Sequence, residues 1–305
     1  MNVAVDSERE GKGNDSIDQA LGPFLNPVEQ ALPDAACLAW RVRNASYVSL
    51  YLAAWNDDIG LIAFPANTES ICSTPVNAPG EYVALSVTDR QQVTQVYHNI
   101  ASSIAQFEVS FNGFSSRADA GLLTAQEQEG LKLFGGKGKC QQCHANKGAG
   151  AVFTDFAFHN LGVPRNPDNV HFNYTTGAFD PGLGGVTGVV TQVGKFRTPT
   201  TRNVAVGVNR TFMHNGVFTN LKQVVDFYNT RDVLRTCTAI EVATLSPSQY
   251  GNYDPDGAGP LTAAGCWPVS EYARNRDTKQ MGNLGLSEAQ VNAIVAYLKA
   301  MSDQP

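Results

Sequence analysis

Apolar residues recur with the spacing of an α-helix in four segments of the chain. One segment covers residues 93–107. In the other three, apolar residues lie on one helix face. Leu131 and Phe134 are three residues apart, and two longer sets recur at i, i+3, i+4 and i+7: Leu221, Val224, Val225 and Tyr228, and Val291, Ile294, Val295 and Leu298. The pattern predicts a mainly α-helical protein.

Two of these helices carry a capping box, in which an N-cap hydroxyl and a Glu or Gln three residues later cap each other's backbone N–H groups. Residues 124–127 read Thr-Ala-Gln-Glu, and residues 287–290 read Ser-Glu-Ala-Gln. The segments between the helices are rich in glycine and proline, notably 160–195 and 245–285. Loops of that length usually wrap a cofactor or carry function.

Composition excludes several classes of protein. Hydrophobic residues make up 43% and charged residues 16% of the chain, which is typical of a globular protein. The net charge of −6 argues against binding to nucleic acid or to an anionic membrane surface, since both need a basic face. No apolar run approaches the roughly 18–20 residues of a membrane helix. We expect neither a membrane span nor a nucleic-acid partner.

The strongest chemical signal is CQQCH at residues 140–144. C-x-x-C-H is the attachment signature of c-type haem, in which the two thiols add to the porphyrin vinyl groups and the adjacent neutral imidazole reaches the iron. A thioredoxin-like pair would lie in a βαβ pattern, and a zinc site would need two further ligands at finger-like spacing. The motif therefore predicts one covalent haem c per chain, held by Cys140 and Cys143, with His144 as the proximal iron ligand.

The sixth iron ligand is open at this stage. Met213, His214, Met281 and Tyr228 are the candidates. Methionine is the commoner second ligand, and Tyr228 taken alone is typical of a core residue on an amphipathic helix.

Four further cysteines fall into two pairs, Cys37 with Cys72 and Cys237 with Cys266. Their spacing suits two loop-closing disulfides, and the alternative is four buried free thiols. Disulfides together with haem c indicate an oxidising compartment, which we expect to be the periplasm. The start MNVAVDSEREGKGND has no signal-peptide pattern, so we expect that an export signal has been removed or that this start is artificial.

From Leu123 onward the chain resembles the haem-bearing C-terminal half of bacterial di-haem cytochrome c peroxidases, and most closely their MauG-like branch. The matching segments, in the family's order, are LTAQEQEGLKLFGGKGKCQQCH, FTDFAFHNLGVP, GKFRTPTTRNVA, FMHNGVFTNLKQVVDFYNTRD and MGNLGLSEAQVNAIVAYLKAMSD. The resemblance implies two cytochrome c-like domains with long loops: residues 1–118, peroxidase-like but lacking their C-x-x-C-H, and residues 119–305, a cytochrome c domain that holds the haem.

The resemblance also implies a role for Tyr228. In these peroxidases a methionine fourteen residues after the histidine of the HNG-like motif is the distal haem ligand, and in the MauG-like branch that position is a ligating tyrosine. Counting from His214 leads to Tyr228. The resemblance therefore favours His144 and Tyr228 as the ligand pair, with Met213 as the alternative. The FHNLGV run implies a structural hydrogen bond for His159 near the haem, and we expect neither His159 nor His171 to be a ligand.

The N-terminal part resembles the same family in the run DSIDQALGPFLNPVEQ. There Gln19, Pro23 and Glu29 have the spacing of residues that line the open face of the peroxidatic haem. The family's glutamate moves a proton between the peroxide oxygens. The resemblance thus makes Gln19 and Glu29 catalytic if a first haem is present.

This sequence departs from the family pattern at three features: the first haem motif, the tryptophan relay and the calcium-binding segment. The family's first C-x-x-C-H lies upstream of this segment, and only eighteen residues precede Gln19 here. Arg9 stands in place of a tryptophan electron relay. Asn209 and Thr211 occupy the T and P places of the family's calcium-binding T-x-P segment, so the case for calcium is weak.

Two functional hypotheses follow. In the first, the His144 haem takes electrons from a small periplasmic cytochrome c or cupredoxin and feeds a first haem that reduces hydrogen peroxide. In the second, the protein is a mono-haem electron-transfer cytochrome, or a subunit of a larger redox complex, without peroxidase activity. A homodimer is compatible with both.

Overall fold

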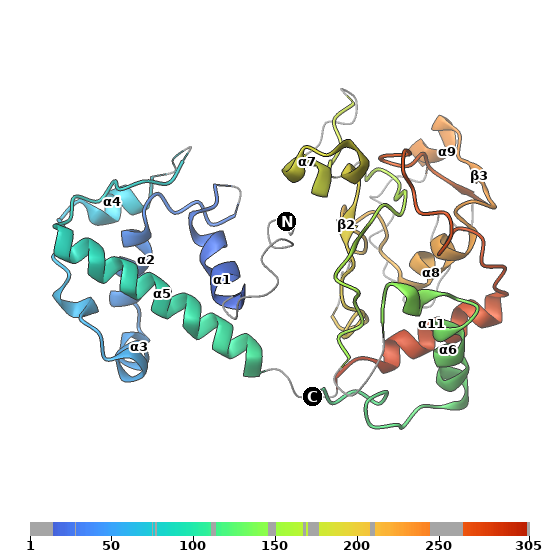
Figure 1. The fold of residues 1–305 in the computed structure, drawn as a ribbon, viewed down its shortest axis with the longest axis horizontal. Coiled ribbons are helices and arrows are strands. Elements are labelled where there is room, and N and C mark those ends of the chain that lie inside the picture. The colour runs from blue at the N-terminus through green and yellow to red at the C-terminus, as the bar shows by residue number, and fades with distance from the viewer. Residues whose placement is uncertain are drawn as a thin grey trace. The chain divides into compact units, whose positions relative to one another are not determined.

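The computed structural model describes residues 15–27, 29–74, 76, 78–110, 114–145, 151–166, 169, 177–207, 211–244 and 265–303. It is mainly helical, as predicted. Its contacts divide the chain into two compact units, residues 6–113 and residues 114–305 (Figure 1). The division lies a few residues before the predicted boundary at 118, and the cytochrome c-like character of the N-terminal unit remains a prediction.

The N-terminal unit is built from helices. Its elements are α1 (Asp15–Leu25), α2 (Ala35–Arg43), α3 (Val48–Trp55), the 3₁₀ turn η2 (Ile59–Leu61), α4 (Thr68–Cys72) and α5 (Val87–Ser110). The long helix α5 packs against α1 and α2, and it contains the segment predicted at 93–107. A disulfide between Cys37 and Cys72 joins α2 to α4, which confirms the first predicted pair.

A buried carboxylate ties these helices together. Asp34 caps the N-terminus of α2 by accepting from the backbone N–H of Ala36 at 2.8 Å, and it also accepts from the N–H of Val83 at 2.9 Å. Both of its oxygens accept from the guanidinium of Arg90 on α5, at 2.7 and 2.9 Å. Burial acts to raise the pKa of Asp34, but these hydrogen bonds and the positive charge of Arg90 outweigh it, so the pKa is lowered.

The C-terminal unit combines helices with short strand pairs. Its elements are α6 (Ala125–Gly135), η3 (Cys140–Gln142), β1 (Phe158–His159), α7 (Leu183–Thr187), η5 (Val190–Gln192), β2 (Phe196–Arg197), α8 (Leu221–Thr230), β3 (Arg235–Thr236), α9 (Ala239–Thr244), β4 (Cys266–Trp267) and α11 (Glu288–Ala300). Strand β1 pairs antiparallel with β2, and β3 pairs parallel with β4. The second predicted disulfide, Cys237 to Cys266, is confirmed beside the latter pair.

Helices α6 and α11 pack on each other and form the base of this unit (Figure 1). Both predicted capping boxes are confirmed, Thr124 with Glu127 on α6 and Ser287 with Gln290 on α11. Helix α8 also packs on α11. The apolar faces of the three helices share one buried cluster, whose members include Leu133, Phe134, Leu221, Val225, Val291, Ile294 and Leu298.

The segments predicted as loops contain some regular structure. Residues 160–195 include α7 and η5, and residues 245–285 include β4. Each of these elements is only two to five residues long, too short for a periodic pattern to reveal. Within the described ranges, no helix combines the length and apolar character that crossing a membrane requires.

We predict that Gly130→Ala destabilises the C-terminal unit. Gly130 lies where α6 meets α11, and a Cβ there would come within 2.0 Å of the Ala293 carbonyl oxygen and 2.8 Å of Cβ of Tyr297. Alanine favours a helix by about 1 kcal/mol over glycine, but overpacking costs about 1–3 kcal/mol or more. The control is Gly22→Ala on α1, where nothing lies within 4 Å. Calorimetry should show a lower melting temperature for the first variant only, and equal behaviour of both would contradict the prediction.

We also predict a pH-dependent contribution from Asp34. Asp34→Ala removes a buried partner of Arg90 and should cost roughly 3–5 kcal/mol at neutral pH. Because the folded-state pKa lies below the ordinary value of 3.8, this contribution is full above that value and disappears as the pH falls through the lowered pKa. Urea titrations of both proteins at several pH values measure it. A difference that stays constant down to strongly acidic pH would refute the assignment.

Candidate functional site

The CQQCH motif follows directly after α6. The helix ends at Gly135, and Lys139 adopts a left-handed conformation with φ 55° that turns the chain into η3. Cys140 and Cys143 are half-buried and outside any disulfide. Burial raises the pKa of the Cys140 thiol to about 12 and that of Cys143 to about 11. Both sulfurs are therefore neutral thiols, the form from which a thioether is made.

The His144 imidazole has a fixed tautomer. Its Nδ1 lies 3.1 Å from the carbonyl oxygen of Phe153, which can only accept a hydrogen bond, so the proton is on Nδ1. Burial lowers the pKa of His144 against the opposing effect of backbone hydrogen bonds at Phe153 and Pro199. The ring is thus neutral, and Nε2 keeps its lone pair. This is the state in which an imidazole binds a metal ion.

Phe153 depends on a second set of contacts. It has φ 54°, a left-handed conformation that costs a residue with a Cβ about 1–2 kcal/mol. Its ring is buried against Phe134, with centroids 6.2 Å apart. Arg202 holds the same loop by donating from Nε to the Ala151 carbonyl at 2.6 Å, and its two Nη atoms each donate to Asp119 at 2.9 Å. These contacts offset the strain and keep the Phe153 carbonyl beside His144.

Tyr228 lies on α8 and packs against the same apolar cluster as Cys140. Burial raises the pKa of its phenol, and negative charge on Cys140 or Cys143 would raise it further, so the phenol is within electrostatic reach of both sulfurs. The helix is held in place by its N-cap Asn220 and by Asn229, whose side chain exchanges two hydrogen bonds with the backbone of Leu286, at 3.0 and 2.9 Å. The structure therefore places Tyr228 and Cys140 against one apolar cluster.

The other ligand candidates have different surroundings. Met213, in a left-handed conformation with φ 71°, packs with Met281 in the neighbouring cluster around Phe218 and Trp267, which Tyr228 also contacts. His214 stacks on Phe196 at 3.5 Å, and its Nε2 lies 2.9 Å from Oε2 of buried Glu271. That pairing occupies one ring nitrogen of His214.

His159 has two acidic neighbours. Its Nε2 lies 2.9 Å from Asp155 and its Nδ1 3.8 Å from Asp277. Cys143, Asp155 and His159 offer ligand atoms within 4.8 Å of one another. The cluster thus lies beside the motif, and the hydrogen bond expected for His159 is present.

Gln19 and Glu29 are in the N-terminal unit, and both are exposed. Gln19 and Pro23 belong to α1. Glu29 follows in a turn, in which its backbone N–H donates to the Asn26 carbonyl. Thr211 is exposed. Arg9, His171 and Asn209 lie outside the described residues.

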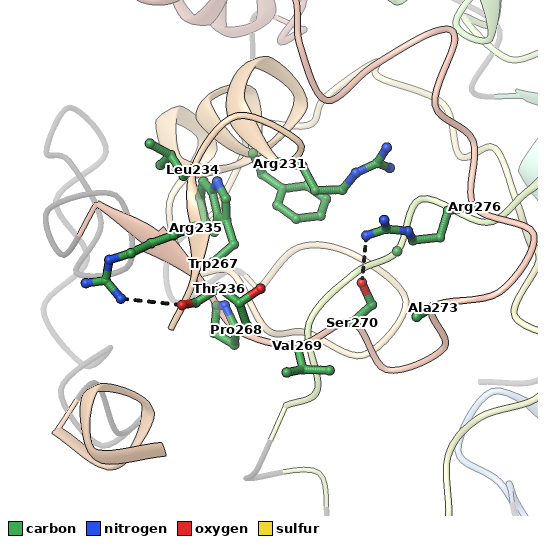
Figure 2. A pocket seen from close by; sticks show the side chains of 12 residues that line it. Arg231, Leu234, Arg235, Thr236, Trp267, Pro268, Val269, Ser270, Ala273 and Arg276 are labelled. Carbon is green, nitrogen blue, oxygen red and sulfur yellow. Dashed lines mark hydrogen bonds between the residues drawn. The ribbon is translucent and has the colours of Figure 1, made fainter. Parts of the chain in front are cut away.

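A separate pocket adjoins α8 and contains none of the predicted site residues (Figure 2). Trp267, Phe227 and Leu234 contribute apolar surface to it. Its arginines already have partners. Arg231 pairs with Asp232 and Arg235 with Glu241. Arg276 donates to Ser270 at 3.3 Å (Figure 2). The pocket therefore gives no evidence for a reaction centre.

Comparison with known proteins finds relatives that are haem peroxidases or MauG. The chain is 28% identical to the methylamine utilization protein MauG of Paracoccus denitrificans over 97% of its own length and 67% of MauG. It is 28% identical to the cytochrome-c peroxidase IdrP2 of Denitromonas iodatirespirans over 62% of its length and 43% of that relative. No family model matches. These relatives support a MauG-like di-haem peroxidase family for the chain.

A solved structure agrees with a di-haem peroxidase fold. The di-haem peroxidase BthA of Burkholderia thailandensis superposes with a TM-score of 0.52 at 24% identity, over 94% of this chain and 63% of BthA. The chain therefore spans about two thirds of MauG and of BthA. Together with the CQQCH motif, these relatives imply c-type haem and a redox role of the peroxidase kind. The two neutral thiols and the neutral His144 imidazole fit such a haem.

Sequence reasoning missed Phe153 and Arg202. Phe153 contributes its backbone carbonyl to the site, and because every residue has one, the residue type does not indicate this role. Phe153 begins the family-like segment FTDFAFHNLGVP, and Arg202 lies within GKFRTPTTRNVA, so both segments contained a signal, although nothing in them indicates the partners His144 and Asp119.

Proposed function

We propose that this protein is a MauG-like redox protein whose C-terminal unit carries one covalent haem c and passes electrons through it. The observation that supports this best is the neutral His144 imidazole, whose Nδ1 hydrogen-bonds the Phe153 carbonyl, next to two neutral thiols. Bound there, the haem supplies a one-electron redox centre. Cys140 and Cys143 would hold it by thioether bonds, and His144 would ligate the iron.

Tyr228 is the proposed second ligand, with Met213 as the alternative. Its phenol shares a cluster with Cys140 and responds to the charge of both motif sulfurs. The buried phenol resists ionisation, so only a strong positive charge nearby would make phenolate its stable form. A phenolate stabilises ferric iron and lowers the reduction potential relative to methionine.

Peroxide reduction would take place at a different site from the His144 haem. Peroxide chemistry needs an open iron position beside an acid–base group, and a haem ligated by both His144 and Tyr228 has none. Hydrogen peroxide takes up two electrons and two protons to give two waters. We propose that Gln19 and Glu29 serve that reaction where a first haem is present, with electrons from a small periplasmic cytochrome c or cupredoxin. Periplasmic location is part of the proposal.

One feature of the sequence favours an alternative function, that of a mono-haem electron-transfer protein. The chain contains a single C-x-x-C-H motif. If the protein binds one haem only, it is a mono-haem electron-transfer cytochrome or a subunit of a redox complex, and Gln19 and Glu29 are surface residues.

We predict that a pyridine haemochrome assay gives one haem per chain for the protein of this sequence. Stopped-flow mixing with hydrogen peroxide should then leave the ferric spectrum unchanged, because the iron is coordinatively saturated. Two haems per chain would contradict the assigned haem content. A rapid spectral reaction at one haem per chain would contradict the assigned ligation.

We further predict that Tyr228→Phe converts the ferric haem toward high spin and raises its reduction potential, because the oxygen ligand is lost. Absorption spectra and redox titration measure both changes. The matched control is Tyr97→Phe, which removes a buried hydroxyl from the N-terminal unit, where it donates to the Leu21 carbonyl at 2.7 Å. If the Tyr228 variant stays low-spin and Met213→Leu does not, Met213 is the ligand instead.

A further inference from the structure

The buried Arg202 side chain uses all three of its guanidinium nitrogens as donors. Nε donates to the Ala151 carbonyl at 2.6 Å, and the two Nη atoms each donate to one carboxylate oxygen of Asp119 at 2.9 Å. Its Cζ lies 3.5 Å from the ring centroid of Phe114 and 5.3 Å from that of Phe153. Two-point pairing with a carboxylate fixes the plane of the guanidinium, so the group is a rigid support for the loop around Phe153.

The same loop is held on the other side of Phe153. The Thr154 hydroxyl donates to the Thr198 carbonyl at 2.7 Å. Thr198 and Arg202 both belong to the short segment 198–202, which therefore bonds the loop before and after Phe153. Phe153 needs this support because its φ of 54° is a conformation that a residue with a Cβ adopts only when its surroundings enforce it.

The position of the Phe153 carbonyl matters for the chemistry of His144. The carbonyl oxygen lies 3.1 Å from Nδ1 of the imidazole. A hydrogen bond donated from Nδ1 makes a metal-bound imidazole a stronger electron donor, which stabilises ferric iron and lowers the reduction potential. The strength of a hydrogen bond depends steeply on its length and angle. Whatever fixes the loop around Phe153 therefore also fixes this electronic effect.

We infer that Arg202 is a positioning residue that lowers the reduction potential of the haem at His144 by holding the Phe153 carbonyl against Nδ1. The inference rests on the proposed function, because it needs a haem at the motif. The charge of Arg202 acts in the opposite direction, since a positive charge favours the ferrous state and raises the potential. Asp119, paired with Arg202 at 2.9 Å, offsets that charge. Positioning and charge thus predict shifts of opposite sign when Arg202 is replaced.

The test is a redox titration of the holoprotein and of two variants, Arg202→Lys and Arg202→Met. Lysine keeps the positive charge, but its single ammonium cannot replace the planar fork that reaches Ala151 and both oxygens of Asp119 at once. Methionine removes the charge and retains an unbranched apolar stem. We expect a higher midpoint potential in both variants. An effect of charge alone would leave the Lys variant unchanged and lower the potential of the Met variant.

Two further variants separate positioning from general stability. Thr154→Val removes the hydrogen bond to Thr198 without changing any charge, and it should also raise the potential. The matched control is Arg90→Lys in the N-terminal unit, where Arg90 likewise pairs through both Nη atoms with Asp34 and donates to the Val83 carbonyl. This control should lower the melting temperature and leave the potential unchanged.

Chemical rescue gives an independent readout. In the Arg202→Ala holoprotein, millimolar methylguanidinium should return the raised potential toward that of the unchanged protein, and methylammonium should not, because only the former reproduces the planar donor group.

Three results would overturn the inference: an unshifted potential in Arg202→Lys, a lowered potential in Arg202→Met, or equal shifts in Arg202→Lys and Arg90→Lys. If the Arg202 variants fail to retain haem, an unshifted potential in Thr154→Val overturns it. Failure of the proposed function is distinguishable, because the unchanged protein would then show no covalent haem spectrum.

Discussion

The hydrogen bond from Nδ1 of His144 to the Phe153 carbonyl is the contact on which the site depends. The motif places thiols and imidazole close together in sequence, but it does not decide which ring nitrogen carries the proton. A carbonyl at Nδ1 makes that decision, and burial keeps the ring neutral. The carbonyl is held by a residue in a strained conformation, and Arg202 and Phe134 keep that residue in place. The proposed iron ligand is thus determined by packing several residues away from the motif.

Features that are local in sequence could be predicted from it. A capping box needs only a hydroxyl and a carboxyl or amide three residues apart, and both examples form. An amphipathic stripe needs only one buried face, and the helix around Tyr228 begins at Leu221 as its apolar pattern begins. The disulfide pairs followed from the short loops they close, and the CQQCH motif carried the haem assignment by itself.

Features that depend on residues distant in sequence could not be predicted. Nothing around Gly130 shows that its missing Cβ admits the backbone of Ala293, about 160 residues away. The contact between Lys139 and Lys279 likewise joins residues 140 positions apart. Choosing between Tyr228 and Met213 required the family's spacing. The structure adds that Met213 packs with Met281 around Phe218, whereas Tyr228 also packs against the cluster that Cys140 adjoins.

Helix α8 links the proposed ligand to the stability of the whole unit. Tyr228 packs against the cluster that Cys140 of the motif also adjoins. The preceding Phe227 is fully buried against Trp267, with ring centroids 5.2 Å apart, and the following Asn229 bonds the backbone of Leu286 just before α11. Three consecutive residues therefore face the haem motif, the disulfide-linked strands and the terminal helix. A rotation of α8 that withdrew the phenol would also expose Phe227 and break both hydrogen bonds of Asn229. Because interiors are close-packed, such a movement is opposed on two sides at once, which favours a fixed oxygen ligand over an exchangeable one.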